Sequence, residues 1–401
     1  MIYINDIVKG IDSIIKLFAD DTSIYLSLDD VQMRTEILNS DMKKITDWSI
    51  KWKVDFNPGK TELITLSSKR DPETDLLKFG NVELVPKSEH KHLGVTIQDD
   101  CKWDEHIYQI ISNVRLHVAC LRSFKYKLSR RTLEIMYKSY ILPHFDYADT
   151  VWDNCTQQLS DELEKLNLDA IRTIIGAVRG TSHYKLYNES GILPLAERRR
   201  RHKLILFFKM TKNMTPNYFT HYLPPLVSDT NPYHHRNPLE RNPPRSRTVL
   251  YQKSFFPSSI ELWNNLPDFI KTSSSIAQFK RYLSENDVTV PPFYYSTNRK
   301  AEIIHCKLRL EISDLNSDLY KRHLTGDMSC LCGSPIENAQ HYLIECPFFD
   351  QYRLTTINLI PHYPHVPTKH LINGSLENSI QENQEIFEKV QEFIILSGRF
   401  P

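Results

Sequence analysis

Over residues 14 to 28 the hydrophobic pattern has the period of two that is typical of β-strands. Ile24 and Leu26, for example, alternate with residues of other character. Successive side chains of a strand point to opposite faces, so this spacing predicts strands with one buried and one open face. Asp20 and Asp21 interrupt the alternation. The segment therefore predicts a hairpin with two adjacent carboxylates at its turn.

The period changes to that of a helix over residues 31 to 52, where apolar residues recur three and four positions apart. Asp29 or Asp30 precedes this segment, and either is a suitable N-cap because its carboxylate accepts hydrogen bonds from the first turn. Two further runs, residues 61 to 68 and residues 90 to 97, predict strands. The first hundred residues are therefore expected to be rich in strands.

Helical spacing dominates the next part of the chain. It recurs over residues 106–124, 129–141 and 161–178 and predicts three packed helices. Residues 213 to 267 differ because they hold nine prolines, a density that predicts an extended and irregular region. Helical spacing returns over residues 375 to 396, which predicts one amphipathic helix near the C-terminus.

Composition limits the classes of protein that fit this pattern. The chain has 401 residues, of which 40% are hydrophobic, so it can build more than one core. The formal net charge is only +1, so any nucleic-acid binding must rely on local patches of charge. No apolar run is long enough to span a membrane, and the N-terminus does not resemble a secretory signal. Seven cysteines, an odd number, favour a reducing intracellular compartment, the nucleus and cytoplasm, over secretion.

The paired aspartates are the first candidate site. Two neighbouring carboxylates repel each other unless a cation lies between them, and Mg²⁺ is the natural cation for carboxylate and phosphate oxygens. At a tight turn Asp20 and Asp21 can converge on one ion, which favours a site for phosphoryl chemistry. An acidic turn that only keeps a hairpin soluble explains the dipeptide equally simply.

The second candidate site is a set of cysteines and one histidine, Cys330, Cys332, His341 and Cys346. Three thiolates and one imidazole make a complete tetrahedral ligand set for Zn²⁺. Gly333 follows the first pair and allows the backbone to turn sharply around a metal. The alternative is reduced cysteines that pack as small hydrophobic residues. Three spare candidates are more readily explained as core or surface residues, namely His305, Cys306 and His323.

Basic residues are concentrated in two places. Residues 197 to 203 read ERRRRHK, and the expected phosphate-binding side chains there are Arg198, Arg199, Arg200, Arg201 and Lys203. The alternative for this run is a solvated helix face. In the proline-rich region, Arg245 and Arg247 lie among aromatic residues, a combination that suits single-stranded RNA. That region could equally be a linker that covers the helical domain.

Several motifs, in order, resemble those of reverse transcriptases from non-LTR retrotransposons of the jockey-like type. The metal-binding hairpin of that family resembles LFADDTSIYLSL, and its neighbours resemble YINDI, ITDWSIKWKVDFNPGKTELITLSS and HKHLGVTIQDDCKWDEHI. Downstream, SYILPHFDYADTVW and SFFPSSIELWNNLP are similar to further segments of these polymerases, and the Cys/His set is similar to their C-terminal Cys/His segment. The resemblance runs from about residue 3 to residue 355.

The resemblance implies an RNA-directed DNA polymerase that uses an RNA template and a DNA primer or target. It implies that two Mg²⁺ ions activate the primer hydroxyl and stabilise the leaving pyrophosphate, with Asp20 as the firmer ligand and Asp21 as the second. Lys60 becomes a candidate proton donor to the leaving group, although it could be a solvated turn lysine. The Cys/His segment is expected to hold Zn²⁺ and to contact template RNA.

One departure from the family pattern limits this expectation. The family site needs another aspartate from a strand well upstream, and only Asp6 and Asp12 precede Asp20 in this sequence. Neither lies in a segment like the required one. We therefore expect the chain by itself, as a truncated C-terminal part, to have no appreciable polymerase activity. The alternative function is non-catalytic binding of RNA or DNA by a remnant or repurposed protein.

The expected fold class is α+β, with a partial polymerase palm of antiparallel sheet and helices, a helical thumb-like domain and a small zinc-binding module. The expected domains are the palm at residues 1–103, the thumb-like domain at 104–212, a proline-rich basic connector at 213–300, the Cys/His zinc module at 301–360 and the amphipathic helix at 361–401.

Overall fold

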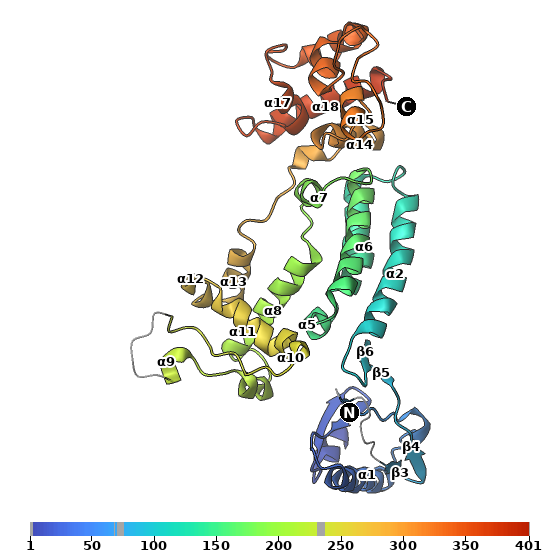
Figure 1. Ribbon diagram of the computed structural model, residues 1–401, viewed down its shortest axis with the longest axis vertical. Coiled ribbons are helices and arrows are strands. Elements are labelled where there is room, and N and C mark those ends of the chain that lie inside the picture. Colours follow the sequence, from blue (N-terminus) through green and yellow to red (C-terminus); the bar gives the residue numbers. More distant parts are fainter. Residues whose placement is uncertain (1–2, 68, 70–75, 231–236, 401) are drawn as a thin grey trace. The chain divides into compact units, whose positions relative to one another are not determined.

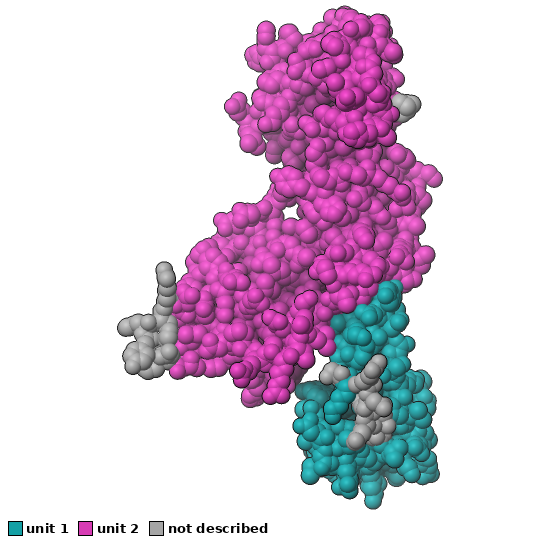
Figure 2. Space-filling view, viewed as in Figure 1, with its two compact units in different colours: residues 1–109 teal, residues 110–401 magenta. Residues whose placement is uncertain are grey.

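The computed structural model describes residues 3–67, 69, 76–230 and 237–400. The pattern of contacts divides the chain into two units, residues 1–109 and residues 110–401, which Figure 2 shows in different colours. The fold is mixed, with many helices and a few short antiparallel strands, as expected for the α+β class. Among the described residues, no helix is both long enough and apolar enough to cross a membrane.

The strands of the first unit pair two by two. The three antiparallel hairpins are β1 (Ile14–Phe18) with β2 (Asp21–Tyr25), β3 (Leu77–Phe79) with β4 (Val82–Leu84), and β5 (Glu89–His92) with β6 (Val95–Gln98). In the described part of the unit these hairpins do not join into the single sheet that the palm expectation required. The predicted strand at residues 61–68 is also wrong for its described residues, since only Leu63 forms a bridge, to Pro86.

Helix α1 (Val31–Trp52) confirms the predicted bounds, and Asp30 is its N-cap. The Asp30 carboxylate accepts a hydrogen bond of 2.9 Å from the backbone N–H of Met33. The helix packs its apolar face on the second hairpin, and Ile45 on α1 is buried in the same core as β3 and β4. This core is the foundation of the first unit. The first unit also contains the short 3₁₀-helices η1 (Tyr3–Val8) and η2 (Pro58–Lys60).

A group of helices, the first of which begins before the boundary at residue 110, confirms the predicted helical block (Figure 1). Its elements are α2 (Asp104–Ser123), α3 (Arg130–Met136), the π-helix η3 (Tyr137–Ile141), α4 (Leu142–Asp146), α5 (Asp149–Trp152), α6 (Gln157–Ile175), α7 (His183–Ser190) and α8 (Leu195–Thr211). Ser129, Thr156 and Ser182 cap α3, α6 and α7, each with its side-chain oxygen. Three hydroxyl caps explain where these helices begin.

The proline-rich region is more regular than the sequence predicted. Within residues 213–267 it forms η4 (Asn217–Tyr222), α9 (Val227–Thr230), α10 (Val249–Lys253) and α11 (Phe255–Asn264). Helices α12 (Asp268–Lys271) and α13 (Ile276–Leu283) follow it. The expectation of an irregular segment is wrong for α11, because Pro257 lies in the first helical turn, where its missing N–H costs no hydrogen bond. Helices α11 and α13 pack on α8 around Phe208 and Trp263.

The C-terminal part shares one hydrophobic core. Its elements are η5 (Pro292–Tyr294), α14 (Arg299–Arg309), α15 (Asn316–Lys321), the π-helix η6 (His341–Glu345), η7 (Pro347–Phe349), α16 (Asp350–Leu354), η8 (Ile357–Leu359), α17 (Thr368–Asn373) and α18 (Ile380–Leu396). Helix α18 confirms the predicted amphipathic helix and begins with a capping box of Ser379 and Glu382. Val390 and Phe393 of α18 are buried with Tyr342 of η6, so the Cys/His segment and the last helix form one core.

Candidate metal centre and nucleic-acid surfaces

The two aspartates lie at the tip of the first hairpin, as predicted. Phe18 pairs with Asp21, so Ala19 and Asp20 form a two-residue turn and Asp21 begins β2. Ala19 has a φ of +54°, in the left-handed region that such turns require and that glycine usually supplies. Both carboxylates are exposed, and neither has an ion-pair partner among the described residues.

A buried carboxylate at the base of this hairpin holds it to α1. Asp41 of α1 is fully buried and accepts a hydrogen bond of 2.7 Å from the backbone N–H of Ser13, just before β1. It also accepts hydrogen bonds from the backbone of Asp12 and from the ammonium of Lys44. Burial opposes ionisation, but these hydrogen bonds prevail and lower the pKa of Asp41. Asp20 and Asp21 therefore lie on a hairpin whose base is fixed to α1.

Lys60, the candidate proton donor, is the last residue of η2 and is exposed. Asn57 fixes the turn because its side-chain oxygen accepts a hydrogen bond of 2.9 Å from the N–H of Gly59. Lys60 has no ion-pair partner in the described part of the chain. The structure therefore leaves its ammonium group available, and its catalytic role stays a prediction.

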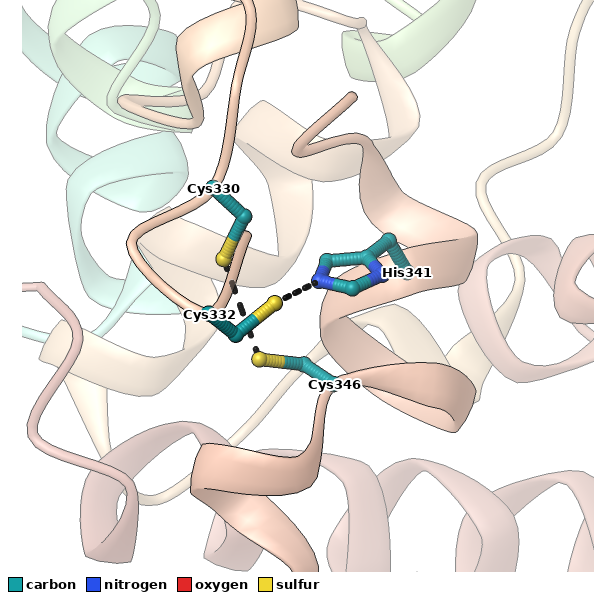
Figure 3. Close-up of side chains that lie close together, drawn as sticks. All are labelled: Cys330, Cys332, His341 and Cys346. Atoms are coloured by element: carbon teal, nitrogen blue, oxygen red, sulfur yellow. Dashed lines mark hydrogen bonds between the residues drawn. The ribbon is translucent and has the colours of Figure 1, made fainter. Parts of the chain in front are cut away.

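The Cys/His set converges as the spacing predicted (Figure 3). The ligand atoms of Cys330, Cys332, His341 and Cys346 all lie within 4.8 Å of one another. Sγ of Cys330 and Sγ of Cys346 are 3.8 Å apart, and Sγ of Cys332 is 3.2 Å from Nε2 of His341. Two sulfur ligands of a tetrahedral Zn²⁺ with bonds of about 2.3 Å lie about 3.8 Å apart. The donor set and its spacing fit a tetrahedral zinc ion.

Two backbone turns bring these ligands together. At the first, Gly333 has a φ of +94° and donates a hydrogen bond of 2.9 Å to the carbonyl of Cys330. At the second, the N–H of Cys346 donates to the carbonyl of His341 over 2.7 Å, closing the π-turn of η6. A π-turn joins residues five positions apart, which explains why a His-x4-Cys pair can face one point.

Surrounding groups orient the set and tune its thiols. Nδ1 of His341 lies 3.6 Å from a carboxylate oxygen of Glu345, on the side of the ring away from the sulfurs. Burial raises the pKa of Cys346 to about 12, whereas the hydrogen bond from the backbone of Ser334 lowers the pKa of Cys332. A bound cation would therefore have to displace protons from the buried thiols.

The spare candidates lie elsewhere, as expected. His305 and Cys306 are buried in α14, and His323 is exposed after α15. Among the described residues none of the three joins the four ligands in a metal-sized cluster.

The basic run of residues 197–203 lies on α8, and carboxylates pair with all five predicted phosphate-binding residues. The ion pairs are Arg198 with Asp146, Arg199 and Lys203 with Asp153, Arg200 with Glu197, and Arg201 with Glu197 and Asp287. Arg199 is 4% exposed and Lys203 is 3% exposed, so the alternative of a solvated face does not describe these two residues. Contact between this run and phosphate stays a prediction.

Arg245 and Arg247 lie in the connector just before α10. Both are exposed and have no ion-pair partner among the described residues. Their guanidinium groups are thus available to a phosphate, and the proposed RNA contact remains to be tested.

A further group of cations was not predicted. One cavity in the second unit is lined by Arg122, Lys125, Arg172, Arg179 and Lys307. They come from three helices and two turns that are far apart in sequence, so no run or motif signals them. Only the packing of α2, α6 and α14 shows that they share a site.

Comparison with curated proteins finds similarity to the products of mobile elements. The chain is 23% identical over 400 residues, 95% of its length, to the retrovirus-related Pol polyprotein from type-1 retrotransposable element R1 of Bradysia coprophila. It is also 23% identical over 167 residues, 41% of its length, to the RNA-directed DNA polymerase from mobile element jockey of Drosophila funebris. These matches cover 36% and 18% of the two relatives. No family model and no solved structure matches the chain.

Proposed function

From this relationship to the proteins of non-LTR retrotransposons, we propose that the chain is the nucleic-acid-binding, zinc-containing part of a reverse transcriptase. The observation that carries the proposal is the convergence of three thiols and one imidazole within 4.8 Å in the Cys/His segment. Zn²⁺ held there would lock the two turns of this segment against each other. The locked segment would then present its surface to template RNA.

Zinc content and RNA binding can be tested together. The purified chain should hold about one equivalent of Zn²⁺, and Cys332→Ser should lower the content below about half an equivalent. The exposed Cys120, outside the cluster, gives the matched control Cys120→Ser, which should keep its zinc. Binding of RNA should weaken with rising salt, because phosphate contacts release counterions. A chain without zinc that binds RNA as tightly as the metal-loaded chain would contradict the proposed role of the metal.

We further propose that Asp20 and Asp21 contribute to a Mg²⁺ site for polymerisation, with Lys60 as proton donor to the leaving group. Both carboxylates are exposed at the hairpin tip and free of ion pairs with described residues, which supports an open cation site. Mg²⁺ would bind the primer hydroxyl and the nucleotide phosphates there. The matches cover only part of the relatives' length, so polymerase activity is a proposal for this chain and rests on the relatives.

One observation favours the alternative function, which is binding of nucleic acid without catalysis. Among the described residues no third Asp, Glu, His or Cys joins Asp20 and Asp21 in a cluster of metal-ligand size. Two adjacent carboxylates hold Mg²⁺ weakly. The chain alone should therefore not extend a templated primer. Extension that is abolished in Asp20→Ala and kept in Asp29→Ala, an exposed aspartate outside the turn, would establish the catalytic function instead.

A further inference from the structure

A cavity of about 380 Å³ in the second unit has a strongly cationic lining. Its walls are the C-terminal end of α2, the turn that follows, the C-terminal end of α6 with its following loop, and Lys307 of α14. Both α2 and α6 line it, and Figure 1 shows these helices side by side with α14 beyond their ends. The volume is that of ordinary ligand sites in proteins.

Five cations face a single carboxylate in this lining. Asp169 pairs with Arg172 over 2.8 Å, and Lys307 pairs with Asp314 over 3.0 Å. The remaining cations, which have no ion-pair partner among the described residues, are Arg122, Lys125 and Arg179. Like charges gathered without counter-charges repel one another, so the cavity favours an anionic occupant.

A buried arginine, Arg299, joins the two main walls of the cavity. The C-terminus of α6 carries a partial negative charge on its last carbonyls. Nη2 of Arg299 donates to two of these carbonyls, those of Thr173 and Ile174, and Nε of Arg299 donates to the carbonyl of Lys125 over 2.9 Å. Arg299 is almost fully buried. It also pairs with the buried Glu302 over 2.7 Å, so it caps the last carbonyls of α6 and holds the α2 turn against α6 without adding net charge.

The turn at Gly176 fixes the other wall. Gly176 has a φ of +77°, and a Cβ there would lie only 2.6 Å from the side chain of Ile303. Glycine thus lets the chain leave α6 close against α14 and brings Arg179 to the cavity. In the same wall, Nη1 of Arg172 donates to the carboxylate of Asp169 over 2.8 Å.

An exposed aromatic ring completes the lining. Tyr126 is 72% exposed, and the ammonium of Lys125 lies 5.1 Å from the centre of its ring. Cations together with an open aromatic face are the features that bind single-stranded nucleic acid, by phosphate contacts and base stacking. A free inorganic anion would leave the ring unused.

We propose that this cavity binds a nucleoside phosphate of single-stranded RNA, with the phosphodiester on Arg122 and Arg179 and the base on Tyr126. The proposal rests on the proposed nucleic-acid-binding function and assigns one site to it. It concerns residues at the end of α2 and in the turns after α2 and α6, and it does not involve the Cys/His set.

The test is binding of labelled oligouridylate by the full chain across a salt series. The double variant Arg122→Gln/Arg179→Gln should bind about tenfold more weakly, and its salt slope should fall by about 1.4, because it lacks two phosphate-binding groups. Tyr126→Ala should also weaken binding about tenfold, whereas Tyr126→Phe keeps the stacking face and should stay within about twofold. The two Tyr126 variants leave the charge of the site unchanged, so they separate stacking from electrostatics.

The matched control is Lys280→Gln/Arg281→Gln on α13, where two exposed cations lie outside the cavity and Arg281 covers the ring of Tyr282. This variant should change affinity by less than about twofold. Equal binding by the Arg122 and Arg179 double variant would overturn this site and leave the proposed function standing. No binding by the unaltered chain would overturn both. Competition by uridine monophosphate as strong as that by the oligomer would identify a free nucleotide as the occupant and overturn the RNA assignment.

Discussion

The basic run on α8 and the cationic cavity differ in what surrounds their charges. Five cations lie almost consecutively on α8, but carboxylates of α4, of α8 and of the segments after α5 and α13 pair with all of them. The cavity gathers five cations from distant parts of the chain and offers one carboxylate, Asp169. A run of charge in a sequence therefore does not by itself identify a positive surface, because the fold decides where the counter-charges lie.

The reason for this difference is burial. Arg199 and Lys203 face the helical core, where an unpaired cation would cost several kcal/mol in desolvation. Asp153 offsets that cost by accepting from both, over 2.5 Å and 2.6 Å. Arg122 and Arg179 are exposed, so water solvates them and no partner is required. The first group stabilises the fold, and the second is available to a ligand.

The largest expected effect concerns the buried pairing. Asp153→Ala leaves Arg199 and Lys203 without their shared counter-charge, so the free energy of unfolding should fall by about 3 kcal/mol. Urea denaturation measures this change. Asp161→Ala, which removes an exposed carboxylate of α6, should cost less than about 0.5 kcal/mol. Equal costs for the two variants would show that the α8 ion pairs do not stabilise the fold.

A smaller effect separates paired from unpaired arginines in RNA binding. Arg179→Gln removes an arginine without a carboxylate partner among the described residues and should weaken oligouridylate binding about threefold. Arg200→Gln removes an arginine that Glu197 already neutralises at 2.7 Å, so affinity should change by less than about 1.5-fold. If Arg200→Gln weakens RNA binding more than Arg179→Gln does, the result supports phosphate contact by the α8 run. It would also show that the α8 run contributes more to RNA binding than the cavity.

The smallest effect is a dependence of stability on acid. Burial opposes ionisation of Glu197, but Arg200 and Arg201 prevail and hold its pKa below the ordinary value of 4.5. A lowered folded-state pKa contributes stability that is fully present above pH 4.5 and disappears as the pH falls through the folded value. Because the group is partly exposed, the decrease should be at most about 0.5 kcal/mol. Urea midpoints measured from about pH 6 downward should show a smaller decline in Glu197→Gln than in the unaltered chain.

Local signals were sufficient for the hairpin tip and its helix. Alternation predicted β1 and β2, and the side chain of Asp30 marks the start of α1. The sequence did not reveal that Asp41 anchors the hairpin, because an aspartate inside a helical pattern reads as an exposed residue. Its burial depends on contacts with Ser13, which lies 28 positions earlier.

The Cys/His set was found from its residue types and their spacing, and the structure brings the four candidate ligand atoms together. The spacing did not predict the π-turn that joins His341 to Cys346, since helical periodicity assumes hydrogen bonds four residues apart. For the proline-rich region the prediction was wrong in the opposite sense, because it expected less regular structure than is present. Proline density predicted irregular chain, yet α11 forms because Pro257 lies in its first turn and Trp263 packs on α8.

The sequence by itself determined the hairpin with its paired aspartates, the principal helices, the Cys/His set and the similarity to retrotransposon proteins. These features depend on residue types at short spacing, which local backbone geometry translates directly into structure. Tertiary structure alone decided which cations are neutralised, which carboxylate is buried and which distant residues share a cavity. Such properties depend on long-range packing, and packing brings Arg122, Arg179 and Lys307 to one place although no local pattern connects them.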